Sequence, residues 1–192
     1  MKAYFCIKSI CDFVLALFLL LLTIPLFIFL FVLLRIHLGE FPLFFQKRIG
    51  LENEVFTVIK FKSLNKFQSA NEDYSNLSVL VRKLGLDELP QLINILKGEM
   101  SFVGPRPLLV EYQDLFNDFQ NIRHQVKPGI TGLVQVSGGN SLSWAERFEL
   151  DVSYVRGFGF LQDVLILLRT PIAILMSKSK SEHQSQRFTG NK

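Results

Sequence analysis

The longest apolar stretch of the chain, residues 13–34, contains no charged residue. At about 22 residues it is long enough for a helix to cross a lipid bilayer. Pro25 lies near its middle, and a proline inside a helix removes one backbone hydrogen bond. Cations flank both ends of the stretch, so the positive-inside rule identifies no outer end. Two topologies remain open: a helix that spans the membrane, and a broken helix that enters and leaves by the cytoplasmic face.

A helical pattern follows between residues 86 and 98, where apolar side chains recur at i, i+3, i+4 and i+7: Leu89, Leu92, Ile93 and Leu96. Two adjacent carboxylates, Asp87 and Glu88, stand at its start, and Gly98 is placed to end it. Their ordinary interpretation is that Asp87 caps the helix and that Glu88 is a first-turn acid. A helix N-terminus also attracts anions, so the carboxylates could meet a phosphate there if a cation held them together.

Most other segments are short. Residues 54–63 alternate as a strand does, and residues 41–50 mix aromatic and basic side chains, which fits either a strand or a segment at the level of lipid headgroups. Residues 65–76 are polar and predict a mobile loop near the candidate site. Residues 108–123 predict an exposed amphipathic helix, and residues 126–140 a glycine-rich loop.

The C-terminal part contains one more helix signal and an apolar segment. Ser143 and Glu146 have the spacing of a capping box at the start of a helix. Residues 163–176 are strongly apolar, too short to cross a bilayer and interrupted by Pro171, so we expect them to lie in the membrane interface. Residues 177–192 are polar and basic and predict a disordered tail.

Composition agrees with one membrane-bound domain. The chain has 192 residues, of which 49% are hydrophobic, and a net charge of only +4. Its basic residues are scattered, which argues against a nucleic-acid-binding surface and favours an anionic membrane surface. Cys6 and Cys11 are the only cysteines and have neither metal-ligand nor disulfide spacing. The predicted fold class is α+β, mainly helical.

Several cations could neutralise a phosphate beside the two carboxylates. Arg106 lies between two prolines, which restrict the backbone and present its guanidinium on a stiff loop. A guanidinium suits bidentate phosphate recognition. Arg82 precedes Asp87 by five positions, and Lys60 and Lys62 come from the predicted strand. The alternative is that Arg106 belongs to an ordinary surface turn and that Arg82 is a solvated charge.

These motifs occur in the order found in a known family. Segments 86–92, 104–108 and 127–132 resemble the small monotopic phosphoglycosyl transferases, bacterial sugar transferases that begin polyprenyl-linked glycans. The resemblance covers roughly residues 5–175 and rests on several long motifs, which makes it specific.

The sequence departs from the family pattern at several positions, among them Leu84 and Gly85, which stand where small hydroxyl residues are common. Ile24 replaces the serine that usually precedes Pro25, and Lys62 replaces an arginine. Gly139 stands where an arginine usually precedes Asn140, so one expected anion contact is absent and sugar specificity does not transfer from relatives.

The resemblance implies an architecture and a location. The N-terminal helix is re-entrant and breaks at Ile24 and Pro25, and a small cytoplasmic domain with interfacial amphipathic helices follows. The chain then divides into an anchor at residues 1–36, a catalytic domain at 37–176 and the tail at 177–192. We expect membrane lipid as a partner, the cytoplasmic face of the bacterial inner membrane as the location, and a homodimer as an option.

The resemblance also implies a reaction, in which a sugar-1-phosphate passes from a UDP-sugar to undecaprenyl phosphate and UMP is released. Asp87 is the implied nucleophile and forms a phosphosugar adduct, chemistry of which aspartate is capable. Asp87 and Glu88 would hold Mg²⁺, a cation that suits carboxylates combined with substrate phosphates. The phosphate-binding cations would be Arg106, Arg82, Lys60 and Lys62, and the substrate loop would supply Gly129, Thr131, Gly132, Gln135 and Asn140.

Two other functions fit parts of the sequence. A non-catalytic membrane adaptor would use the same apolar anchor and amphipathic helices, but it gives no role to Asp87, Glu88 and Arg106. A metal-dependent phosphohydrolase would use the same site with water in place of the lipid acceptor. The three functions differ in their products. A transferase forms a polyprenyl-diphosphate-sugar, a phosphohydrolase releases free sugar phosphate, and an adaptor forms no product.

Overall fold

The structure is a computed structural model that describes residues 2–62, 76–176 and 188–190. Residues 65–75 of the loop expected at 65–76, and most of the expected tail, lie outside these residues, and Asn76 begins a helix. The strands form two small sheets, and the described chain is α+β and mainly helical, as predicted. Its elements are α1 (Lys2–Leu38), β1 (Leu43–Ile49), β2 (Val55–Phe61), α3 (Asn76–Lys83), the 3-10 turn η2 (Leu86–Glu88), α4 (Gln91–Leu96), β3 (Ser101–Val103), η3 (Val110–Leu115), α5 (Asp118–Asn121), η4 (Ile122–Gln125), β4 (Gly129–Thr131), α6 (Leu133–Ser137), α7 (Trp144–Arg156) and α8 (Phe160–Met176), with short turns at Leu51–Asn53 and Gly139–Ser141.

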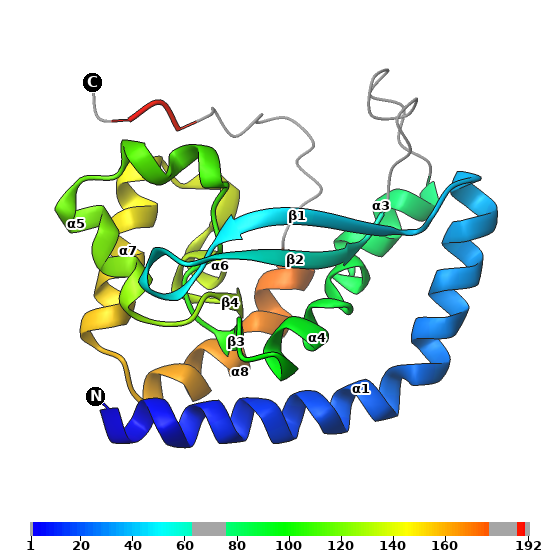
Figure 1. Ribbon diagram of the computed structural model, residues 1–192, viewed down its shortest axis with the longest axis horizontal. Coiled ribbons are helices and arrows are strands. Elements are labelled where there is room, and N and C mark those ends of the chain that lie inside the picture. Colours follow the sequence, from blue (N-terminus) through cyan, green and yellow to red (C-terminus); the bar gives the residue numbers. More distant parts are fainter. Residues whose placement is uncertain (1, 63–75, 177–187, 191–192) are drawn as a thin grey trace.

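Helix α1 is long, apolar and bent. Its N-terminal arm runs along the base of the molecule and its C-terminal arm rises along one side (Figure 1). Pro25 lies inside it and has no N–H to donate to the preceding turn, while Thr23 Oγ1 donates to the carbonyl of Leu19 at 2.7 Å. By length and composition α1 is able to cross a membrane, and few of its side chains are buried. An apolar surface of this extent marks a segment that contacts lipid or another apolar partner.

The bent helix is also part of the protein core. Strands β1 and β2 form an antiparallel hairpin, and α4 packs between this hairpin and the N-terminal arm of α1. Ala16 of α1 joins Phe56, Leu92 and Ile95 in one buried cluster. Leu34, on the C-terminal arm, belongs to a second cluster that includes Phe61 and Val81. Both arms of α1 are therefore fixed to the layer that carries the candidate site.

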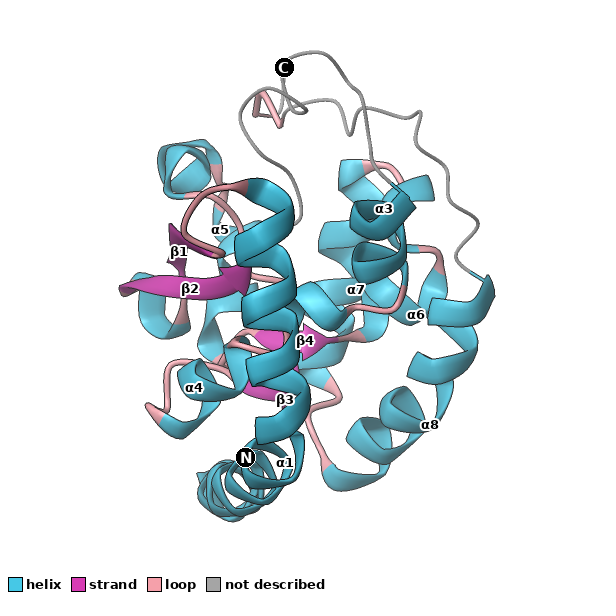
Figure 2. Cartoon of the chain, turned by 90° about the vertical axis from the view of Figure 1, so that its right-hand side faces the viewer, coloured by secondary structure: helices cyan, strands magenta, loops and turns pink. Residues whose placement is uncertain are grey.

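A polar junction joins the N-terminal arm of α1 to α8. Lys8 Nζ lies 2.7 Å from Asp163 Oδ2, and the hydroxyl groups of Tyr4 and Tyr154 each donate to this carboxylate at 2.7 Å. Helix α8 lies on the same lower side of the molecule as this arm in both views (Figures 1 and 2). The two apolar helices consequently share one face of the molecule.

Residues 108–123 do not form the predicted amphipathic helix. They divide into η3, α5 and the start of η4, and Phe116 between η3 and α5 is extended, with ψ 135°. Asn117 explains the break, because its side chain accepts from the N–H of Gln120 and forms a capping box that restarts the helix. Local capping has overridden the apolar periodicity.

Three other expectations are corrected. Asp87 is not the cap of a helix that begins after it: it lies in η2, and Pro90 precedes α4 without a side-chain cap. The glycine-rich region 126–140 contains β4 and α6, and α8 continues through Pro171. The cap prediction failed because Pro90 has no N–H that the Asp87 side chain could accept from, and the N–H of Leu89 donates to the carbonyl of Leu86 instead.

Other local predictions are confirmed. Gly98, with φ +77°, donates to the carbonyl of Ile95 at the end of α4. Ser143 and Glu146 form the predicted capping box of α7.

The tail contains one large apolar side chain, Phe188, which is 5% exposed and packs in an aromatic cluster with Tyr112, Phe148, Phe116 and Trp144. That contact was not expected from a polar tail.

Candidate active site

Three predicted site residues, from a strand, a 3-10 turn and a loop, meet in one ion-pair cluster. Lys60 Nζ of β2 lies 2.8 Å from Glu88 Oε1 of η2, and Arg106 Nη2 lies 2.9 Å from the same oxygen. The side chains of Lys60 and Glu88 are 21% and 18% exposed, whereas that of Arg106 is 49% exposed. Lys60 and Glu88 are thus largely shielded from solvent, whereas the guanidinium of Arg106 reaches it.

The register between β2 and α4 is fixed by Asn94, which is fully buried. Its Oδ1 accepts from the N–H of Ile59 at 3.1 Å, and its Nδ2 donates to the carbonyl of Thr57 at 2.7 Å. Nδ2 also donates to Glu99 at 2.7 Å. A buried amide with these partners holds α4 against the strand that carries Lys60. The neighbouring turn η2 is therefore held where Glu88 meets that lysine.

The two adjacent carboxylates have opposite electrostatic environments. Burial, together with the charge of Glu88, raises the pKa of Asp87 to about 6. Burial also acts to raise the pKa of Glu88, but the charges and hydrogen bonds of Arg106 and Lys60 outweigh it and lower this pKa to about 2. Glu88 is accordingly a permanent anion that holds two cations, while Asp87 changes charge close to neutral pH.

The other two predicted cations lie differently. Arg82, at the end of α3, is exposed, and its positive charge acts to lower the pKa of Asp87. The ammonium of Lys62 pairs with Glu40 at 2.8 Å, so its charge is already matched outside the Glu88 cluster. The structure therefore brings Lys60, Arg106 and Arg82 toward the carboxylates and gives Lys62 a different partner.

The predicted substrate loop divides into a buried part and an exposed part. Gly129, Thr131 and Gly132 are buried, and a Cβ on Gly129 would lie 2.1 Å from the backbone N of Gly104. The same atom on Gly132 would lie 2.2 Å from the carbonyl O of Gly104. These glycines thus let two backbone segments approach each other. The contact between these two backbone segments supports the loop that carries Arg106.

Thr131, Gln135 and Asn140 complete that set. The hydroxyl of Thr131 bonds that of Thr170 on α8 at 2.8 Å. Gln135, on α6, has buried side-chain polar atoms, and they find no hydrogen-bond partner within the described part of the chain. Asn140 is exposed, and its carbonyl accepts from Arg147 at 3.0 Å.

Sequence reasoning missed three charged residues that contact the Arg106 loop or its support. Arg48 donates to the carbonyl of Pro107 at 3.3 Å, and Arg123 donates to the carbonyl of Arg106 at 2.7 Å. Asp151 pairs with Arg123 at 2.8 Å. Single charges embedded in apolar surroundings have no periodic signal; only their position on an expected buried face could have marked them.

The carboxylates allow one mode of Mg²⁺ binding. In the part of the chain that the structure describes, there is no group of three or more carboxylate, histidine or cysteine side chains that could hold a metal ion. Asp87 and Glu88 offer two carboxylates, and one oxygen of Glu88 already accepts from Lys60 and Arg106. Mg²⁺ commonly takes one or two protein carboxylates together with substrate phosphates and waters. The residues fit that mode and do not form an all-protein cage.

Comparison with known proteins gives a consistent result. The family model "Bacterial sugar transferase" matches residues 3–177. The chain is 40% identical to the "Uncharacterized sugar transferase EpsL" of Bacillus subtilis, over 96% of each chain. It is 33% identical to the "Exopolysaccharide production protein ExoY" of Rhizobium meliloti, over 83% of this chain and 81% of that protein.

A longer relative carries a more specific name. The "Undecaprenyl-phosphate galactose phosphotransferase" of Salmonella typhimurium is 31% identical over 88% of this chain. The matched region makes up 40% of that protein. The similarity therefore lies in a segment that these longer proteins share with this chain.

Proposed function

The chain belongs to the bacterial sugar transferase family, and on that basis we propose that it transfers a sugar-1-phosphate from a UDP-sugar to undecaprenyl phosphate. The observation that carries the proposal is the carboxylate pair, in which Glu88 anchors Lys60 and Arg106 beside an Asp87 whose pKa is raised to about 6. Relatives named as undecaprenyl-phosphate sugar phosphotransferases support the choice of substrates.

Asp87 acts as the nucleophile in a first step. One carboxylate oxygen attacks the sugar-bearing phosphorus of the UDP-sugar, the bond from that phosphorus to the bridging oxygen breaks, and UMP leaves. Lys60 and Arg106 neutralise charge that develops on the phosphate oxygens. In a second step an oxygen of undecaprenyl phosphate attacks the same phosphorus and restores the carboxylate, leaving a polyprenyl-diphosphate-sugar.

The acceptor reduces the need for a general base. A phosphate monoester has its second pKa near 6, so it is largely a dianion at neutral pH. Glu88, with its pKa lowered to about 2, is poorly suited to accept a proton and instead positions the cations. Asp87 and Glu88 would hold Mg²⁺ together with the diphosphate, and the ion would supply further charge neutralisation.

We also propose a re-entrant anchor. The bend of α1 and the apolar face shared with α8 support a helix that enters and leaves by the cytoplasmic face of the inner membrane (Figure 1). Residues 1–36 are then the anchor, 37–176 the catalytic domain and 177–192 the tail.

The test is a product assay on the full chain in detergent with a panel of UDP-sugars and undecaprenyl phosphate. We expect UMP and a polyprenyl-diphosphate-sugar in equal amounts for at least one donor. Free sugar phosphate formed independently of the acceptor would favour a phosphohydrolase. The absence of any product across the panel would favour the adaptor.

A further inference from the structure

The loop that carries Arg106 is bonded at four consecutive carbonyl groups. Those of Pro105 and Leu108 accept from the backbone N–H of Gly129 and Ile49, each at 3.0 Å. Between them, the carbonyl of Arg106 accepts from Arg123 at 2.7 Å and that of Pro107 from Arg48 at 3.3 Å. Two of the four bonds therefore come from arginine side chains rather than from neighbouring backbone.

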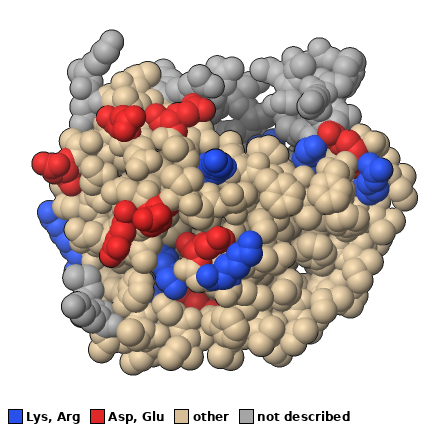
Figure 3. Space-filling model, in the orientation of Figure 1, with Lys and Arg blue, Asp and Glu red and all other residues tan. Residues whose placement is uncertain are grey.

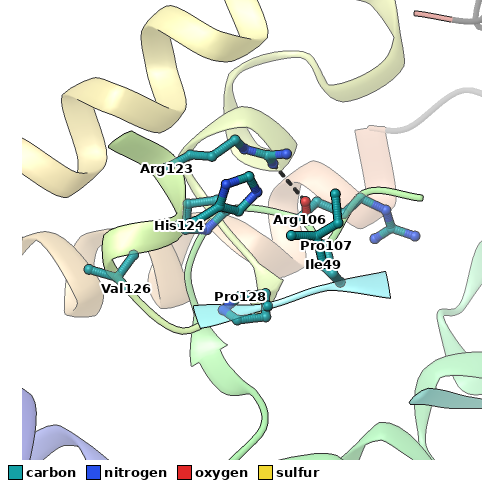
Figure 4. Close-up of a pocket in the computed structure, with 9 residues that line it drawn as sticks. Ile49, Arg106, Pro107, Arg123, His124, Val126 and Pro128 are labelled. Atoms are coloured by element: carbon teal, nitrogen blue, oxygen red, sulfur yellow. Dashed lines mark hydrogen bonds between the residues drawn. The ribbon is translucent and has the colours of Figure 1, made fainter. Parts of the chain in front are cut away.

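Arg123 is the more deeply placed of these two arginines. It is 3% exposed, and the same Nη2 that donates to the Arg106 carbonyl lies 2.8 Å from Asp151 Oδ2. Its guanidinium also lies 5.7 Å from the ring centroid of Phe148, on the same helix as Asp151. Figure 4 shows Arg123 and the side chain of Arg106 on different sides of the loop. Arg123 thus holds the main chain and leaves the Arg106 guanidinium free to reach Glu88.

The stability of the fold gives little reason for such a pair. Burying two charges removes them from water, and a well-packed apolar pair often stabilises a protein equally well. Among the residues that the structure describes, Nε and Nη1 of Arg123 also have no hydrogen-bond partner. What the pair adds is a fixed position for the carbonyl of Arg106, to which an apolar side chain could not bond.

We propose that Arg123 and Asp151 are positioning residues of the sugar-phosphate transfer: α7 holds Arg123, and Arg123 sets the backbone at Arg106. This inference rests on the proposed function. A small displacement of a charge-stabilising group can slow a reaction by up to about 10²-fold. The pair therefore affects the rate through Arg106, without touching the substrate.

The experiment is a double-mutant cycle that measures the rate of UMP release by the full chain. Arg123→Lys keeps the positive charge but loses the geometry that serves both partners, and we expect a loss of about tenfold or more. In an Arg106→Ala background the same substitution should change the residual rate by less than about twofold, because the group it positions is gone. An equal loss in both backgrounds would overturn the proposal.

Two further variants complete the test. Asp151→Asn keeps the side-chain size and an acceptor, and we expect a smaller loss, about threefold or more, again absent without Arg106. Arg156→Lys is the control: it lies on the same helix, is exposed and contacts Phe119, and it should not alter the rate. Unfolding of both Arg123→Lys and Asp151→Asn would show a purely structural pair and contradict the proposal. Lack of UMP release by the unsubstituted chain would instead contradict the proposed function itself.

Discussion

At the scale of single residues, Asp87 and Glu88 are neighbours in sequence with different chemistry. Glu88 accepts from two cations, which lower its pKa to about 2, whereas burial and the charge of Glu88 raise the pKa of Asp87 to about 6. Environments that make the pKa values of two carboxyl groups differ in this way suit the groups to different roles. In the proposed mechanism Glu88 is therefore the anchor for the cations and Asp87 the nucleophile.

This difference predicts the pH dependence of the first half-reaction. Because the nucleophile must be ionised, the rate of UMP release should rise with pH around a midpoint near 6, the pKa of Asp87 in the free enzyme. Glu88→Gln should move that midpoint to lower pH, because it removes a negative charge that raises this pKa. Stopped-flow measurement of UMP release between about pH 4.5 and 8 would show the rate on both sides of that midpoint. A midpoint unchanged by Glu88→Gln would contradict the electrostatic account.

The same two groups act oppositely on stability. Glu88 has its pKa lowered from an ordinary 4.5, so its contribution is present above that pH and is lost as the pH falls toward about 2. Asp87 has its pKa raised from an ordinary 3.8, so stability falls as the pH rises from there through about 6.

Arg106 and Lys62 should differ strongly when substituted. Arg106→Ala removes a partly exposed guanidinium bonded to Glu88, and we expect turnover to fall about 10²-fold or more. Lys62→Ala breaks an ion pair with Glu40 that lies outside the Glu88 cluster. Because a partly exposed pair contributes little, we expect turnover to fall by no more than about threefold. Steady-state UMP release under one set of conditions compares them. Equal, small losses would mean that the diphosphate binds elsewhere.

The residues that sequence reasoning identified share one property: they stand in local motifs. Asp87, Glu88 and Arg106 are framed by prolines or by helical periodicity, and Lys60 sits in a clear strand. Arg123 and Asp151 were not identified because their roles depend on a contact between α7 and a loop far away in sequence. A pattern along the chain contains no information on that pairing.

At the scale of elements, the alternating strand and the two-residue capping box were predicted correctly, whereas the single cap at Asp87 and the helix at residues 108–123 were not. The strand β2, the capping box of α7 and the end of α4 at Gly98 follow the sequence closely. Residues 108–123 divide into several short helices because Phe116 is extended and Asn117 then caps the start of a new helix. Neighbouring caps can override an apolar repeat of this length.

The bend of α1 is the element on which membrane topology depends. If the helix is re-entrant, Lys2→Cys and Glu40→Cys in a background without Cys6 and Cys11 should label from the same side of the membrane. Pro25→Ala restores a backbone N–H and should favour a straighter helix, so we expect partial labelling of the two positions from opposite sides. If positions 2 and 40 label from opposite sides in the protein that retains Pro25, the re-entrant anchor is excluded.

At the scale of the whole molecule, one face shows an apolar margin set apart from the charged side chains. The lower margin of the space-filling view, where α1 runs, shows no charge, and Lys, Arg, Asp and Glu gather above it (Figure 3). Asp163 joins α8 to α1 through Lys8 and Tyr4, and α1 packs in turn against α4, which follows the turn that carries Asp87 and Glu88. This arrangement suits a reaction between a water-soluble donor and a lipid acceptor.

The central claim, that Asp87 forms a covalent adduct, is tested most directly by a reaction without lipid acceptor. With a UDP-sugar labelled in its sugar phosphate, the account predicts UMP release stoichiometric with enzyme and label that stays on the protein until undecaprenyl phosphate removes it. Asp87→Asn, which keeps the size of the side chain and removes the attacking charge, should fold and form no adduct. A well-folded Asp87→Asn protein with near-normal turnover would contradict the account.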